Sequence, residues 1–125
     1  MPGGKRVEAE HRGFTIRTDQ PETEGGEGSA PGPFDLFLAS IGTCTAYYVL
    51  AFCQRRDIPT DEIELTLNAI RNDEKRMIER IDISVHLPTS FPERYVDACL
   101  KSAAQCAVKK HLHDPPEIAL SAAMC

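Results

Sequence analysis

The chain has 125 residues, of which 42% are hydrophobic and 26% charged, and its formal net charge is −5. This length is enough for one modest hydrophobic core, so we expect a single domain over residues 1–125. The acidic balance argues against a nucleic-acid surface, which needs a basic stripe to neutralise phosphate. It also argues against docking on anionic membrane lipids.

The N-terminus is polar, with Met1 followed by proline, glycine, lysine and arginine rather than by the apolar stretch of a secretion signal. We therefore expect a cytoplasmic protein. The apolar segment 36–53 is barely long enough to span a membrane, follows Asp35, and contains glycine, serine and threonine. A buried core helix is the favoured interpretation, so no membrane contact is predicted.

The first half of the chain predicts a hairpin, a loop and a long helix. Apolar and polar residues alternate over 5–11 and 14–18, and Arg12-Gly13 can turn the chain between them. Residues 19–32 are rich in glycine and glutamate and read as a loop. Residues 33–56 read as a helix that is apolar on nearly every side, which is typical of a central, covered element.

The second half predicts two strands, one helix and a last strand. Residues 63–69 and 81–87 alternate as strands with one wet face. Ser90 and Glu93 have the spacing of a capping box, which predicts a helix to about Leu112. Residues 117–123 could form a final strand. The order strand-strand-helix-strand-strand-helix-strand indicates an α+β fold.

Five cysteines are present, at positions 44, 53, 99, 106 and 125. None forms a C-x-x-C pair, and without a secretion signal a structural disulfide framework is not expected. The short ligand spacings of zinc sites are also missing, so we expect neither metal nor cofactor. Free, buried or redox-active thiols remain.

Two of the cysteines are candidates for chemistry. A helix break at Gly42 would place the Cys44 sulfur near a helix N-terminus, where free amides and the helix dipole stabilise a thiolate. The alternative is an inert cysteine in an apolar helix. Cys106 lies on the predicted second long helix, on one face with Cys99 and Ala103, and could meet Cys44 in a shared core. Spacing alone does not decide this.

The remaining cysteines and the histidines have simpler interpretations. Cys53 and Cys99 are more typical of core packing, and Cys125 is expected to be exposed at the chain end. The histidines are scattered, so a cysteine–histidine catalytic pair is disfavoured. They stand at positions 11, 86, 111 and 113.

Two motifs give the chain a resemblance to the OsmC-like proteins. Pro33 and Cys44 keep the family spacing of eleven residues between a motif proline and a cysteine, and Cys106 matches the second family cysteine on a later helix. The matching residues are Asp19-Gln20-Pro21, Gly25-Gly26, Pro31 to Leu36 and Ala39 to Thr45, and then Cys106, Val108 and Leu112.

The resemblance implies a fold and a chemistry. It implies antiparallel sheets wrapped around two central helices in an intertwined homodimer, with two sites at the subunit interface. Better known members are thiol peroxidases. On that analogy Cys44 attacks the peroxide and becomes a sulfenic acid, Cys106 condenses with it to a disulfide, and an external dithiol restores both thiols.

The chain departs from the peroxidase members at three points. Phe34 stands where they carry a glutamate that holds an arginine over the reactive sulfur. Asp35 is the nearest carboxylate, but one helical step turns its side chain by about 100°. Arg17 is the candidate for that arginine, with Arg12 as the second choice and a solvated strand face as the alternative. Ala107 replaces a proline found in many members.

Three functions therefore remain open. The first is a two-cysteine peroxidase for organic or hydrogen peroxide, served by Cys44, Cys106, Arg17 and Asp35. The second is a binding or redox-sensing protein whose cysteine-lined interface pocket holds a small apolar or thiol-containing ligand without turnover. The third is hydrolytic or transferase chemistry through Cys44. Retention of both motif cysteines favours redox work, whereas Phe34 favours binding or a changed substrate.

Overall fold

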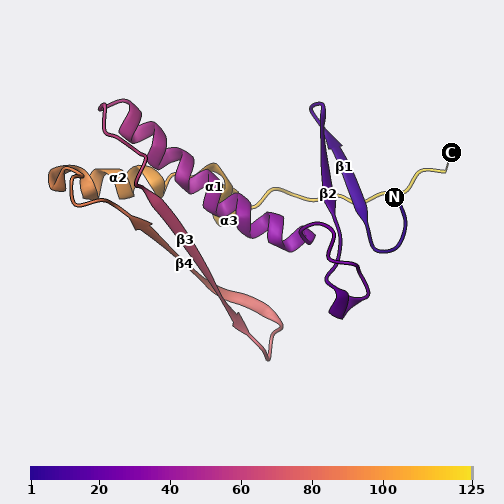
Figure 1. Cartoon of the computed structure of the whole chain (residues 1–125). Coiled ribbons are helices and arrows are strands. Elements are labelled where there is room, and N and C mark those ends of the chain that lie inside the picture. The colour runs from indigo at the N-terminus through magenta and orange to yellow at the C-terminus, as the bar shows by residue number, and fades with distance from the viewer. Residues whose placement is uncertain (125) are drawn as a thin grey trace. The chain divides into compact units, whose positions relative to one another are not determined.

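The computed structural model describes residues 1–124, so Cys125 lies outside the described residues. It divides into two compact units, residues 1–40 and the residues from 41 onward, and each is described by itself. Figure 1 shows the elements in chain order, two hairpins and three α-helices. Short 3₁₀ turns at Glu22–Glu24 and Glu93–Tyr95 complete the secondary structure of the described chain.

The first unit begins with the predicted hairpin. Strands β1 (Val7–His11) and β2 (Phe14–Thr18) pair antiparallel, with Val7 opposite Thr18. Arg12 and Gly13 both have positive φ, 51° and 84°, which is the backbone that a tight two-residue hairpin turn requires. Nearly every side chain of the hairpin is exposed, and Phe14 keeps 72% of its surface. The hairpin therefore forms from local pattern and turn chemistry without burying a core face.

The loop after β2 is organised around a buried carboxylate. Asp19 is 1% exposed and accepts hydrogen bonds from the amides of Gln20 (2.7 Å) and Ser29 (3.1 Å) and from the Ser29 hydroxyl (2.6 Å). The amide of Glu27 donates a further bond of 3.3 Å. These donors, the Ser29 hydroxyl first, lower the pKa of Asp19 to about 2. This ordered structure could not be predicted from the sequence, because the segment has no periodic pattern of apolar residues.

Gly26 closes against the same residues. A Cβ atom built there would collide with the backbone oxygen of Gln20 and would lie 2.8 Å from the Asp19 carboxylate. Only glycine fits, because the backbone of the loop must pass directly over the start of its own turn.

The helix α1 (Pro33–Gln54) is continuous, so the predicted break at Gly42 is wrong. At its start the Asp35 carboxylate accepts a hydrogen bond from the Gly32 amide at 2.9 Å. The helix is long and apolar enough to cross a membrane by length and composition alone, and 28% of its apolar window is buried. Tyr47 remains 62% exposed. Within the described residues, the expected full cover of this helix is not present.

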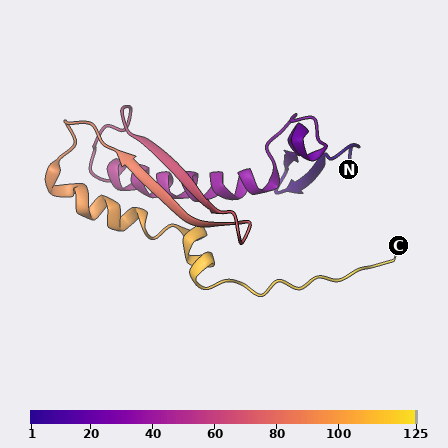
Figure 2. The same ribbon diagram turned by 90° about the horizontal axis from the view of Figure 1, so that it is seen from below.

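A second hairpin packs against α1. Strands β3 (Glu64–Asn72) and β4 (Met77–His86) pair antiparallel with a bulge between Ile70 and Arg71. Figure 2 shows this hairpin alongside α1. A Cβ on Gly42 would meet Leu65 and Leu67 of β3 at ordinary contact distance. Both predicted strands are confirmed, and both extend toward the polar turn between them.

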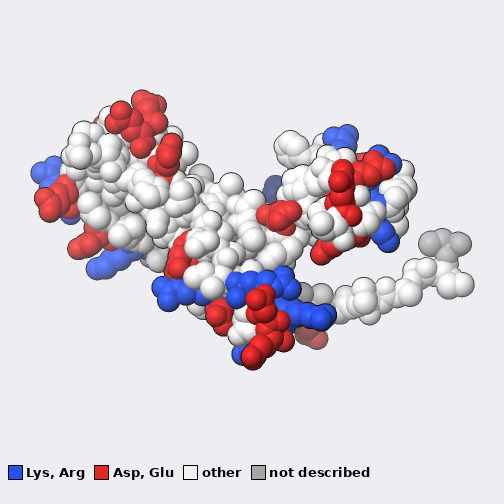
Figure 3. Space-filling model, turned by 60° about the horizontal axis from the view of Figure 1, so that its bottom comes forward, with Lys and Arg blue, Asp and Glu red and all other residues white. Residues whose placement is uncertain are grey.

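The core of the second unit lies between the C-terminal half of α1, the β3–β4 hairpin and α2 (Val96–Ala103). Its buried members are Val49, Phe52, Cys53, Phe91, Cys99 and Ala103. Charged side chains of both signs gather at the exposed β3–β4 turn, as Figure 3 shows, so this part of the surface is not a single-sign patch.

The C-terminal third departs from the prediction. The expected single helix is broken into α2 and α3 (Ala107–His113), separated by residues 104–106. The capping box is wrong as well, because Pro92 precedes the 3₁₀ turn and, in this described segment, no side chain caps it. Residues 117–123 are exposed and form no strand within residues 1–124, since alternation cannot make a strand without a neighbouring strand to bond.

The Asp19 loop predicts a pH dependence. A depressed pKa means that the carboxylate stabilises the folded loop fully above its ordinary value near 3.8, and that this stabilisation is lost as pH falls through about 2. The amide resonances of Glu27 and Ser29 should therefore titrate with an apparent pKa near 2 in NMR spectra. Asp19→Asn should remove the transition, whereas Asp61→Asn, at an exposed site, should leave it. Titration near 4 in the unaltered protein would contradict the assignment.

Candidate dithiol site

The structure brings Cys44 and Cys106 together. Cys44 lies in the middle of α1 and is half-buried, and Cys106 stands immediately before α3 and is fully buried. Their side chains hydrogen-bond to one another. The long helix expected to present Cys106 is absent from this part of the described chain, yet the predicted meeting of the two sulfurs is observed. The interruption between α2 and α3 turns the sulfur of Cys106 toward α1.

Amides of the first turn of α3 surround the Cys106 sulfur. Burial acts to raise its pKa, but the backbone of Lys109, the thiol of Cys44, the backbone of Val108 and the side chain of Thr45 together lower it below the ordinary value. The Cys106 side chain does not form a capping hydrogen bond at the start of this described helix. The amides of Lys109 and Val108 nevertheless lower the pKa of its thiol. The Cys106 thiolate is thus more stable than that of an ordinary cysteine.

This result reverses one prediction. The free amides of a helix N-terminus were predicted for Cys44, and that prediction is wrong because α1 runs unbroken through Gly42. The physical mechanism was sound, but it operates at Cys106, where a helix does begin. The missed signal was weak, since residues 102–106 hold neither proline nor glycine to indicate a break.

Thr45 lies beside the pair and fixes its surroundings. Its hydroxyl donates to the Ile41 carbonyl at 2.6 Å, one turn earlier in α1, and its side chain also contacts the Cys106 sulfur. Thr45 is 2% exposed. Its role could not be predicted from the sequence, because a threonine in an apolar helix is usually an ordinary backbone-bonded side chain.

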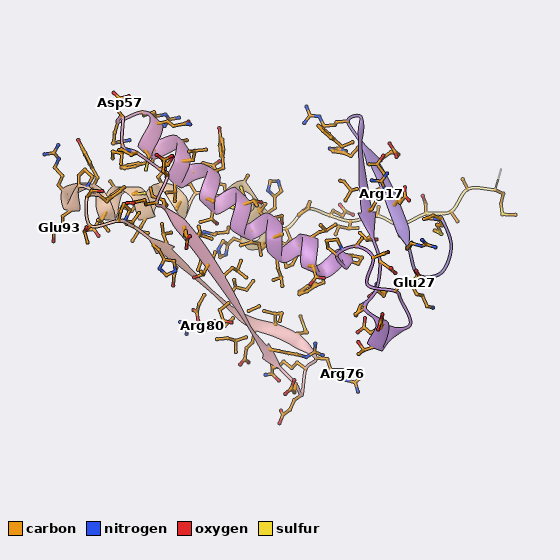
Figure 4. The ribbon with its side chains drawn as sticks, viewed as in Figure 1. Arg17, Glu27, Asp57, Arg76, Arg80 and Glu93 are labelled. Carbon is orange, nitrogen blue, oxygen red and sulfur yellow. The ribbon has the colours of Figure 1, made fainter. Side chains whose placement is uncertain are left out.

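The other two predicted site residues lie in the first unit. Arg17 is an exposed residue of β2 opposite Glu8 (Figure 4), and with Arg6 and Ser29 it lines a shallow hollow. Asp35 accepts its hydrogen bond from Gly32 at the start of α1. That either residue acts at the Cys44 sulfur stays a prediction.

An apolar hollow of about 400 Å³ opens on another face of α1. It lies between α1 and the β3–β4 hairpin and is lined by Thr43, Tyr47, Leu50, Ile63, Leu65 and Val85 among others. Cys44 is not one of its lining residues, so this hollow is not the cysteine-lined interface pocket of the binding hypothesis. Among residues 1–124, no group of three or more His, Cys, Asp or Glu side chains could hold a metal ion.

The pKa of Cys106 can be tested residue by residue. In Cys44→Ala the S–H donor is gone, so the pKa of Cys106 should rise toward the value of an ordinary thiol. The ¹³Cβ resonances of labelled cysteines, followed against pH, report each thiol separately. Cys53→Ala is the matched control, because Cys53 does not act on Cys106. An unchanged Cys106 titration in Cys44→Ala would show that the sulfur–sulfur hydrogen bond has no influence.

Comparison with solved structures places the fold. A protein from Psychrobacter arcticus 273-4, described as belonging to the osmotic stress induced and detoxification response, superposes with a TM-score of 0.75 at 20% identity, over 88% of this chain and 82% of that one. A second solved structure, from structural genomics, gives a TM-score of 0.76 at 20% identity, over 92% and 86%.

A third structure has a functional description. The organic hydroperoxide resistance protein OsmC of Legionella pneumophila, described as a predicted redox protein and regulator of sulfide bond formation, matches with a TM-score of 0.51 at 18% identity, over 88% of each chain. At these identities the likeness shows the α+β fold. No protein with a curated description matches the sequence.

The family model for OsmC-like proteins matches residues 26–121, which is most of the chain. That stretch contains Cys44, Cys106 and the helices that present them. The family is associated with organic hydroperoxide resistance and includes peroxidases. The chain belongs to the OsmC-like family.

Proposed function

We propose that this protein is a thiol peroxidase that reduces organic or hydrogen peroxides through a two-cysteine cycle of Cys44 and Cys106. The observation that carries the proposal is the hydrogen bond between the two sulfurs, one of which has a lowered pKa. A thiolate is the nucleophile toward a peroxide, and a second thiol at hydrogen-bond distance can capture the sulfenic acid before it oxidises further.

The different exposure of the two sulfurs supports the roles that we propose for them. Cys106 is fully buried, whereas Cys44 is half-buried, so a peroxide reaches Cys44 first. The Cys106 thiolate accepts the proton of Cys44 across their hydrogen bond and leaves a thiolate on the accessible sulfur. The backbone amides that stabilise the Cys106 thiolate thus keep a base beside the nucleophile Cys44.

The cycle then balances in three steps. The Cys44 thiolate attacks one peroxide oxygen, the O–O bond breaks, and the leaving oxygen takes a proton to depart as an alcohol or water. The Cys106 sulfur attacks the Cys44 sulfenic acid, an S–S bond forms, and water leaves. An external dithiol donates two electrons and two protons, becomes a disulfide itself, and restores both thiols.

Arg17 and Asp35 are proposed as the polar groups that orient the peroxide at Cys44. The proposal for Asp35 must accommodate its bond to the Gly32 amide, which already uses one carboxylate oxygen. A carboxylate has a second oxygen with free lone pairs, so a guanidinium can still bind it.

We also propose that the protein is a cytoplasmic homodimer. The support for the dimer is the exposed part of α1, where Tyr47 and Leu50 lie on a helix too apolar to face water. A second copy would cover this face without burying charge. The same exposure fits the family resemblance to an intertwined dimer.

The second candidate function is binding of a small apolar ligand without turnover. The hollow between α1 and the β3–β4 hairpin favours it, because apolar side chains dominate its walls and its volume of about 400 Å³ is that of a small-molecule site. Oxidation kinetics separate the two functions, since a binding protein needs no fast thiol.

Stopped-flow oxidation of the reduced protein with cumene hydroperoxide tests the peroxidase. Two thiols per chain should be lost much faster than an ordinary free thiol reacts. Cys44→Ser should abolish the fast phase, because the attacking sulfur is gone. Cys106→Ser should give one reaction per chain and a sulfenic acid that dimedone traps. Equal rates in all three proteins would reject the proposal in favour of ligand binding.

The dimer is tested by sedimentation velocity. Tyr47→Asp places a charge on the exposed apolar face of α1 and should shift the protein toward monomer. Gln54→Asp, at an exposed position at the end of the same helix, is the matched control and should leave the dimer intact. A native protein that sediments as a monomer at all concentrations would contradict the assembly.

A further inference from the structure

A second pair of cysteines lies inside the core. Cys53 of α1 and Cys99 of α2 are both 0% exposed, and their side chains hydrogen-bond to one another. They belong to the cluster that packs α1 against α2, with Val49, Phe52 and Phe91 around them. From the sequence each was predicted to be a core-packing residue, and no pairing between them was expected. The structure makes them a pair.

We propose that Cys53 and Cys99 form a second redox site, a buried dithiol that closes to an intramolecular disulfide between α1 and α2 when a two-electron oxidant reaches it. The site uses neither Cys44 nor Cys106, so it does not rest on the proposed peroxidase. With a peroxide as oxidant, one sulfur takes an oxygen and releases an alcohol or water. The other sulfur then attacks it, the S–S bond forms, and water leaves.

The surroundings of Cys53 and Cys99 make their oxidation slow, whereas the proposed oxidation of Cys44 and Cys106 is fast. Burial raises the pKa of both thiols, so little thiolate is present near neutral pH. Neither sulfur has an exposed surface, and an oxidant can enter only when the packing of α1 against α2 opens locally. The pair therefore remains reduced in the intact core and reacts in proportion to how often that core opens.

One cation partly offsets the effect of burial on the pKa of these two thiols. Arg56 acts on both thiols and lowers their pKa in part. Its guanidinium lies 3.7 Å from the centre of the Phe52 ring and donates to the Phe52 carbonyl at 3.1 Å, so the charge is held beside the pair. A thiolate formed on opening thus has a positive partner close by.

Closure of the bond would stabilise the unit that opened. The disulfide would cross-link residues 53 and 99 and restrict the denatured chain between them, which raises resistance to unfolding. When a core that has opened under oxidative conditions packs again, the disulfide would hold it in the packed form. A general dithiol reductant reverses it.

The test uses a chain whose only cysteines are the pair. The variant Cys44→Ser, Cys106→Ser, Cys125→Ser is treated with diamide, which takes one hydrogen from each thiol. We expect slow loss of two thiols per chain, a Cys53–Cys99 linkage in the peptide mass spectrum, and a faster reaction in urea below the unfolding transition. The urea midpoint should rise after oxidation and return with dithiothreitol.

Three results would overturn the proposal. They are thiols that stay reduced until global unfolding, a linkage found only between chains, and a closed bond that leaves the urea midpoint unchanged. Adding Cys53→Ala or Cys99→Ala to the variant is the matched control and must remove the intramolecular linkage. Peptide mapping of the oxidised unaltered protein gives the same readout without the serine substitutions. There the Cys53–Cys99 bond should appear after the fast thiols are lost.

Discussion

The chemistry of the first dithiol depends on the interruption between α2 and α3. In a continuous helix the amides of Val108 and Lys109 would bond to carbonyls one turn earlier and would be unavailable to a sulfur. Because α3 restarts at Ala107, these amides belong to a first turn and have no partner within the helix. The same interruption turns Cys106 from the α2 face toward Thr45 and Cys44. Position and protonation of the sulfur therefore have one cause.

The interruption is built by tightening of the backbone rather than by a helix breaker. The amide of Ala104 still bonds to Leu100 at 3.0 Å, but those of Gln105 and Cys106 bond only three residues back, at 3.1 and 3.4 Å. Such 3₁₀ geometry is common where an α-helix ends. Tertiary packing selects it here, since Cys99 and Ala103 are buried in the core cluster while Cys106 is buried against α1. One straight helix could not place the side chains of Cys99 and Ala103 in the core cluster and, at the same time, that of Cys106 against Cys44 and Thr45.

This explains which features the sequence could predict. Period-two alternation and the Arg12-Gly13 turn are local, and both hairpins were predicted correctly. Two apolar helix faces made a meeting of Cys44 with Cys106 possible, but spacing could not decide it, and the helix expected to carry Cys106 ends before that residue. The order around Asp19 was missed because a buried carboxylate with backbone donors has no periodic signature. Residues 117–123 show the opposite error: a strand pattern is a property of one segment, whereas a strand requires a neighbour.

Two cysteine pairs that share the helix α1 have opposite chemical characters, and the difference comes from their settings. Cys44 and Cys53 both lie on α1, and each hydrogen-bonds to a cysteine in the following helical region. Near Cys44 the partner receives free amides and the helix remains partly open to solvent. Near Cys53 the partner lies within a closed apolar cluster, and burial outweighs the influence of Arg56. Contact between two sulfurs alone therefore does not make a reactive site. Reactivity also requires backbone amides free to stabilise a thiolate and a path by which solvent and oxidant reach the sulfur.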